Sequence, residues 1–170
     1  MTPLPIDTTP LPTARLRKRL LCMVYEAMLL FGILFIATWA FSTLLQQRHA
    51  LYLRDALQDW LFVVLGVYFC WIWTHGGQTL AMKTWRIKVL DRHGLALSQT
   101  LALKRFFLSG MWFAPPLALA WFIDLPVMTT LAAACIWVLL WAGASRFAPR
   151  EQFWHDVWAG TQLVHEPMAD

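Results

Sequence analysis

Long blocks of apolar residues, separated by polar segments, dominate the pattern of this chain. The blocks cover about residues 20–45, 57–74, 106–123 and 127–144. Three of them are close to the roughly 20 residues with which a helix crosses a bilayer, and the first is long enough to cross with a tilt. Glu26 interrupts the first block, and Pro115-Pro116 lies near the middle of the third. The pattern predicts an all-α membrane protein with four transmembrane helices, the third of them either kinked at the prolines or turned into a re-entrant segment.

The polar segment between the second and third blocks carries its own signals. Residues 85–90 alternate and are rich in β-formers, residues 91–94 read as a turn, and Leu95 to Leu97 is expected to return as a second strand. This predicts a short β-hairpin, which would need support from the bundle or the membrane surface. Residues 78–84 favour a short surface helix, and Ser98 favours the N-cap of a helix leading into Arg105.

The two ends are polar. Residues 1–14 hold four of the nine prolines and are expected to form a disordered tail. Residues 145–170 also read as a polar tail, with residues 166–170 outside the folded part. The membrane domain is therefore expected to cover residues 15–165.

Composition supports a place in the membrane. Hydrophobic residues make up 59% of the chain, against about 45–50% in a soluble domain, and the chain holds eleven Trp, a residue that favours membrane interfaces. The three cysteines all lie inside apolar runs, which predicts no disulfide framework and no zinc site.

Basic residues predict the orientation. They gather before the first block (Arg15, Arg17, Lys18, Arg19), between the second and third (Lys83, Arg86, Lys88, Arg92, Lys104, Arg105) and after the fourth (Arg146, Arg150). The opposite loops hold only Arg48 and Arg54. The positive-inside rule therefore places both termini and the middle loop in the cytoplasm. The net charge of +4 favours contact with lipid headgroups. The sequence has no basic face interleaved with aromatic residues, so nucleic acid is not expected as a partner.

Three patches occur in an order that resembles the RDD family of small membrane proteins. They are the pair Arg19 and Glu26, the stretch GGQTLAMKTWRIKVLDRHGLALSQTLALKRFF over residues 76–107, and FWHDVWAGTQLV over residues 153–164. The family is named for one arginine and two aspartates, and the resemblance covers about residues 15–165. It implies membrane location, and it carries a weak suggestion of ion or proton antiport.

The resemblance is carried over position by position. Arg19 stands at the family arginine, Asp156 at the second aspartate, and Glu26 where the first aspartate would stand, so the charge is kept on a longer side chain. Further matches are Gly77, Thr79, Lys83, Gly94, Arg105, Gly160 and Thr161, whereas Ala81-Met82 departs from the usual pattern before the lysine.

Glu26 is the sharpest candidate for chemistry. An ionised carboxylate at bilayer depth costs roughly 2.5–3.5 kcal/mol on insertion scales, so we expect a compensating partner. One hypothesis is a buried network of Arg19, Glu26, Arg105 and Asp156 on the cytoplasmic side, in which Glu26 could also carry a proton. The alternative is that Glu26 reaches the interface or holds the helices in register.

Other chemistry finds little support. The five histidines are scattered without metal spacing, and no nucleophile elbow or phosphate loop is present. His155 and Asp156 are neighbours, but adjacent helical residues point apart, so a helix-start contact is expected rather than a dyad. We therefore expect no enzyme, no catalytic residue, no metal and no cofactor.

Two functional hypotheses remain. The first is an RDD-type protein of the bacterial inner membrane in an accessory or transport-related role, with its charged residues serving first as architecture. The second is a proton-coupled ion antiporter that uses Glu26 and Asp156. The apolar blocks hold no further acid near the midplane, so a transport path would need a homo-oligomer. The expected partners are the lipid bilayer and an unidentified protein.

Overall fold

The computed structural model describes residues 12–45 and 53–166. The described chain is mostly helical, with one small sheet. Its elements are α1 (Leu16–Leu44), α2 (Arg54–His75), α3 (Leu80–Trp85), β1 (Ile87–Asp91), α4 (Gln99–Ser109), η1 (Gly110–Trp112), α5 (Ala114–Ile123), α6 (Val127–Ala144), η2 (Ser145–Phe147), η3 (Pro149–Glu151), α7 (Trp154–Ala159) and β2 (Thr161–His165).

Three helical segments are long and apolar enough to cross a membrane. They are α1, α2 and the segment Val127–Phe147, which contains α6. Large apolar side chains stay exposed along them, for example Phe35, Trp71 and Leu139 at 67%, 62% and 69%. A soluble protein rarely exposes apolar surface on this scale. The structure is therefore that of a membrane protein.

The third apolar block is not one continuous helix. Gln99–Trp112 and Ala114–Ile123 are bent by 50° at a short break, and the pair counts as a fourth span only if both halves belong to one crossing. Pro115 and Pro116 fall in the first turn of α5, where a helix has no use for their missing N–H groups. The prolines thus begin a new helix after the bend. Helix α4 begins at Gln99, as predicted, because the hydroxyl of the N-cap residue Ser98 accepts a hydrogen bond from the Leu101 N–H at 3.3 Å.

The predicted hairpin is wrong. Residues 95–97 form no strand, and β1 instead pairs antiparallel with β2 at the other end of the chain, with Ile87 opposite His165 and Asp91 opposite Thr161. Asp91 closes a tight turn, since its carboxylate accepts bonds from the N–H groups of His93 and Leu95. The C-terminal strand is the better partner because Leu163 and Val164 are buried with it, whereas Leu95 is 65% exposed.

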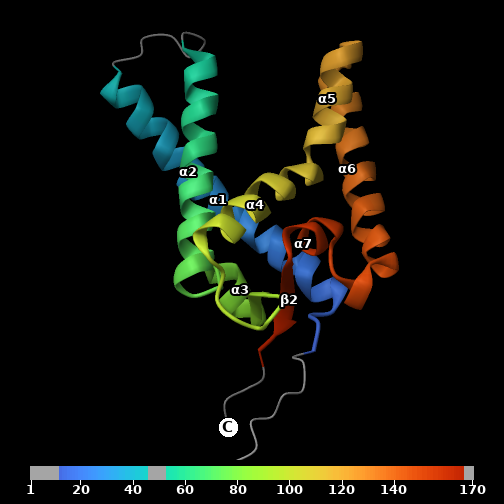
Figure 1. Cartoon of the computed structure of the whole chain (residues 1–170). Helices are drawn as coiled ribbons and strands as arrows, with labels where there is room; N and C mark the ends of the chain where they lie inside the picture. The colour runs from blue at the N-terminus through green and yellow to red at the C-terminus, as the bar shows by residue number, and fades with distance from the viewer. Residues whose placement is uncertain (1–11, 46–52, 167–170) are drawn as a thin grey trace, which may run out of the picture.

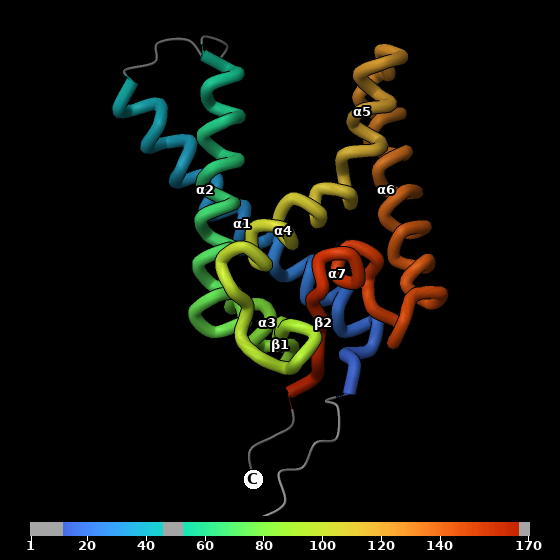
Figure 2. The backbone as a smooth tube through the Cα atoms, viewed as in Figure 1, coloured from blue at the N-terminus to red at the C-terminus, as the bar shows by residue number. Residues whose placement is uncertain are grey.

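The sheet, α3 and α7 gather at the end of the molecule where α1 begins (Figure 2). We call these four elements, with residues 12–14, the cap. Thr13 bridges to Val164, and Pro12 accepts a bond from the His165 N–H, so residues 12–14 are extended along β2 rather than part of a disordered tail. Residues 145–166 are likewise folded rather than a loose polar tail. The rest of the two expected tails, residues 1–11 and 167–170, lies outside the described residues.

Two helix pairs extend away from the cap. Figure 1 shows α1 and α2 as one arm and α5 and α6 as the other, with α4 running between the arms. Helix α4 packs on α2 and on α7, so it joins the first arm to the cap and then leads into the second. This placement puts one face of α4 opposite the start of α1.

Candidate functional site

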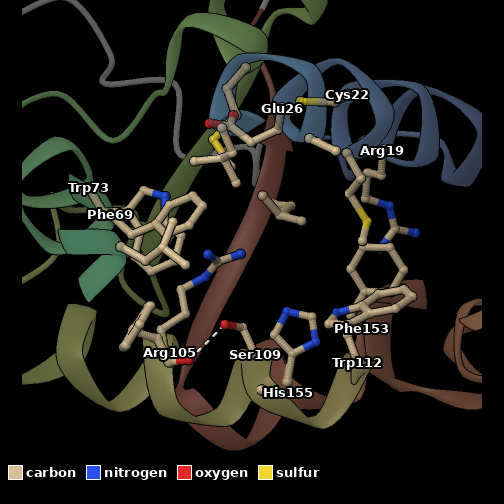
Figure 3. A pocket seen from close by; sticks show the side chains of 18 of the residues that line it. Arg19, Cys22, Glu26, Phe69, Trp73, Arg105, Ser109, Trp112, Phe153 and His155 are labelled. Carbon is tan, nitrogen blue, oxygen red and sulfur yellow. Dashed lines mark hydrogen bonds between the residues drawn. The ribbon is translucent and has the colours of Figure 1, made fainter. Parts of the chain in front are cut away.

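A cavity of about 430 Å³ lies between α1, α2, α4, η1 and the cap. Three of the four charged residues singled out in the sequence, Arg19, Glu26 and Arg105, line it, together with His155. Figure 3 shows Arg19, Cys22 and Glu26 on α1 along one side, Arg105 and Ser109 on α4 along another, and aromatic side chains between them. Its volume falls within the roughly 300–1,000 Å³ of ligand sites.

Asp156 does not line the cavity but forms an ion pair with Arg105, which does. The Arg105 Nε and Nη2 atoms are each 2.8 Å from Asp156 Oδ1, and their side chains are only 5% and 0% exposed. The Thr161 hydroxyl donates a further bond to the same oxygen at 3.1 Å, and the Arg105 guanidinium lies 4.3 Å from the centre of the Trp73 ring. A buried pair of this kind fixes α4 against α7, because removing either charge leaves the other buried without a partner.

Arg19 is buried, and no carboxylate of the described residues pairs with it. It is 2% exposed, its Nη2 donates to the Glu151 carbonyl oxygen at 2.7 Å, and its guanidinium lies 4.4 Å from the centre of the Phe153 ring. Within the described residues its Nε and Nη1 atoms have no hydrogen-bond partner. Buried donors are almost always satisfied, so a buried cation with two unpartnered donor atoms is unusual.

Glu26 is held by hydroxyl groups rather than by a base. It is 8% exposed, and it accepts bonds from the Tyr68 hydroxyl at 2.9 Å and from the Thr79 hydroxyl. Over residues 12–45 and 53–166 no basic group comes within 4 Å of its carboxylate. The four charged residues therefore do not form one network: Arg105 pairs with Asp156, while α2 and the start of α3 supply the partners of Glu26. The sequence signal for a partner of Glu26 was Tyr68, a single phenol in the second apolar block, and it was missed.

A family model for the RDD family matches residues 13–160, which is most of the chain. The chain belongs to the RDD family. This confirms the resemblance drawn from the three sequence patches. No curated protein and no solved structure matches the chain.

His155 is the site residue of this RDD protein that the sequence did not predict. It is 4% exposed, lines the cavity, and places its Nε2 atom 3.6 Å from Asp156 Oδ2. Burial lowers the His155 pKa to about 4, with the charges of Arg105 and Arg19 acting in the same direction and that of Asp156 against it. The ring is therefore neutral at pH 7. Phe153, two residues earlier in the chain, stacks on the His155 ring and was the sequence signal for its burial.

The cavity of the RDD protein is lined by polar atoms that have no partner in the described residues. Arg19 offers free N–H donors, and the adjacent neutral His155 has an unpartnered Nδ1 atom in the described structure. The only hydroxyl group among the residues lining the cavity, that of Ser109, donates to the Phe106 carbonyl oxygen. In the described residues no group of three or more His, Cys, Asp or Glu side chains is placed to hold a metal ion. The arrangement can hold an anionic group beside an apolar wall.

Proposed function

We propose that this RDD protein is a four-span protein of the bacterial inner membrane that acts in transport, or as an accessory subunit, through a ligand bound in the cavity beside the cap. The observation that carries the proposal is Arg19, a buried cation that lines the cavity and keeps two guanidinium nitrogen atoms without partners in the described structure. A polar group left unsatisfied in this way costs about 1–3 kcal/mol, and more when it is charged. A ligand would offset that cost. The proposal includes no catalytic step.

Orientation follows from the charges. The basic residues at the start of α1, between α2 and the middle of α4, and after α6 all belong to or flank the cap end. The positive-inside rule supports a cytoplasmic cap with both termini on the same side. The cavity would then lie at the cytoplasmic side of the bilayer.

The ligand cavity can be tested by filling it. Ala27 is an exposed residue of α1 that lines the cavity, and its neighbour Met28 is 67% exposed and does not. The purified protein is placed in nanodiscs of phosphatidylcholine and exposed to bacterial lipid and small-molecule extracts, and its Tm is measured. We expect an extract to raise the Tm of the parent and of the Met28→Trp variant but not that of Ala27→Trp. An absent shift in the parent, or an equal shift in Ala27→Trp, would refute a ligand role.

Proton-coupled antiport is the second candidate. It is favoured by Glu26, a buried carboxylate that faces the cavity and is bound by two hydroxyls rather than by a cation. In this candidate function, the carboxylate would exchange a proton for a metal ion. A path to the far side would have to form between copies in a homo-oligomer, because the apolar blocks supply no second acid near the midplane.

The antiporter candidate is tested by flux. The protein is reconstituted in vesicles with a pH-sensitive dye inside, and Na⁺ or K⁺ is added across an imposed pH gradient. Antiport predicts proton movement that Glu26→Gln abolishes and that the surface change Glu166→Gln leaves intact. Parent vesicles without ion-dependent proton movement would rule this candidate out.

A further inference from the structure

The polarity of the cavity changes from one end to the other. Its polar end contains Arg19 and His155, which are 2% and 4% exposed and lie against the buried ring of Phe153. Its apolar end is lined by Leu30, Phe62 and Phe107, and the last two are 49% and 59% exposed. The cavity is therefore closed around its cation and open between apolar side chains.

This gradient runs along the membrane helix α1. Arg19 lies in the first turn of α1 beside the cap, and Leu30 follows eleven residues later, a rise of about 16 Å. The polar end thus lies near the membrane surface, and the apolar end lies in the hydrocarbon layer. A lipid of the same leaflet has its headgroup and its acyl chain arranged in this order.

We propose that the cavity binds an anionic lipid of the surrounding bilayer, with its headgroup phosphate on Arg19 and an acyl chain leaving past Leu30 and Phe62. The proposal rests on the proposed function, since it names the ligand of the same cavity. Phosphate oxygens would accept hydrogen bonds from the Nε and Nη1 atoms of Arg19, which have no partner in the described chain.

The charges around the cavity favour an anion at this position. Arg105 is already neutralised by Asp156, and the Glu26 carboxylate is bound by Tyr68 and Thr79. Glu26 also follows Arg19 by seven residues, about 10 Å along the helix axis. Arg19 is therefore the lining cation that has no carboxylate partner in the described part of the chain. The exposed phenylalanines at the apolar end favour a ligand with a hydrocarbon chain over a free anion in water.

Native mass spectrometry tests this proposal directly. The full chain in mild detergent is titrated with phosphatidylglycerol and with phosphatidylcholine of the same acyl chains, and with glycerol phosphate as a soluble competitor. Two variants change the cavity, Arg19→Gln at the polar end and Ala27→Trp at the apolar end. Each has a neighbouring control on the same helix, the exposed Arg17→Gln and Met28→Trp. Size exclusion confirms that each variant is folded.

We expect one phosphatidylglycerol to bind the parent and both controls more tightly than phosphatidylcholine. Arg19→Gln should weaken this binding by at least about tenfold, the value of a lost charge-assisted hydrogen bond. Ala27→Trp should abolish it without any change of charge, which keeps the test decisive if Arg19→Gln fails to fold. Equal binding of the two lipids, or unchanged binding in Ala27→Trp, would overturn the proposal.

Two outcomes separate this proposal from the proposed function. If glycerol phosphate alone saturates the site and displaces the lipid, the ligand is a water-soluble anion, so the lipid proposal fails and the ligand cavity stands. If neither lipid nor any extract component shifts the parent more than Ala27→Trp, both fail.

Discussion

The charged residues of this RDD protein are stabilised in different ways although they lie near one another. Arg105 and Asp156 neutralise each other at 2.8 Å with almost no exposure. Glu26 relies on two neutral hydroxyls, and Arg19 on one carbonyl oxygen and an aromatic ring. A buried ion pair fixes two elements, whereas a cation with free donors remains available to a ligand. The first pair is therefore architectural, and Arg19 is the residue available for binding.

Asp156→Asn is expected to destabilise the fold strongly. The change leaves the Arg105 guanidinium buried without its counter-charge, and breaking a buried pair costs about 3–5 kcal/mol. The matched control is Glu166→Gln, which removes the partly exposed pair of Lys88 and Glu166 and should cost less than about 1 kcal/mol. Denaturant unfolding in detergent measures both, and equal losses would contradict an architectural role for Asp156.

His155 is expected to make stability depend on pH. Its pKa is about 4 in the fold and about 6.5 when unfolded, so between these values the unfolded chain binds more protons. The stability contributed by the neutral ring is thus present above pH 6.5 and is lost as the pH falls toward 4, by on the order of 3 kcal/mol. The charged groups that face His155 are Arg19 of α1, Arg105 of α4 and its neighbour Asp156.

The free energy of unfolding, measured between pH 4 and 8, tests this prediction. His155→Gln should flatten the slope between pH 6.5 and 4, whereas the exposed His93→Gln should keep it. An unchanged slope in His155→Gln would assign the dependence to other groups.

At the scale of elements, the β1–β2 sheet joins the middle of the chain to its end. Gly77 supports β1 from the loop before α3, because its carbonyl oxygen accepts the Val89 N–H at 2.8 Å. Its φ is +69°, and an added Cβ would lie 2.7 Å from the Val89 carbonyl oxygen. Only glycine fits both conditions without strain.

Gly77→Ala should therefore cost more stability than Gly94→Ala. Gly94 has a similar φ of +81°, but an added Cβ would meet nothing within 4 Å. Both variants carry the penalty of a left-handed alanine, roughly 1–2 kcal/mol, and Gly77→Ala adds the clash. The difference between their unfolding free energies measures the contact with β1, and similar losses would show that the loop can move aside.

The sequence was informative where a signal is local. The apolar blocks gave the membrane helices, and Ser98 marked the start of α4, because hydrophobic period and capping act within a few residues. The partner of β1 was missed because alternation identifies a strand without identifying its neighbour, and the true partner lies more than 70 residues away. The partners of Glu26 were missed for the same reason, since Tyr68 and Thr79 reach it only through the packing of α2 and α3 on α1.

At the scale of the whole molecule, the cap constrains the topology. Residues 12–14, β1 and β2 meet in one sheet-like arrangement, so the chain must return to the same end after α2 and again after α6. Figure 1 shows that the α5–α6 connection lies at the end of the molecule away from the cap. The arm formed by α1 and α2 extends to the same end. Helix α6 has 18 residues and a length of about 27 Å, close to the hydrocarbon thickness. If the bent pair of α4 and α5 is one crossing, the number of crossings is even and both facts are satisfied, as the four-span proposal requires.

The turn after α5 and the turn after β1 are therefore expected to face opposite sides of the membrane. Single cysteines are placed at Leu125 and at His93 in a chain whose three native cysteines are changed to alanine, and spheroplasts are treated with a membrane-impermeant maleimide. Leu125→Cys should react in intact spheroplasts, and His93→Cys only after lysis, because α4 and α5 together carry the chain from the cytoplasmic cap to the far side. If instead the bent pair were re-entrant, Leu125→Cys would also require lysis. In that case a crossing α6 would carry β2 away from β1, with which it pairs, so this result would mean that α6 does not cross either and would contradict the four-span proposal.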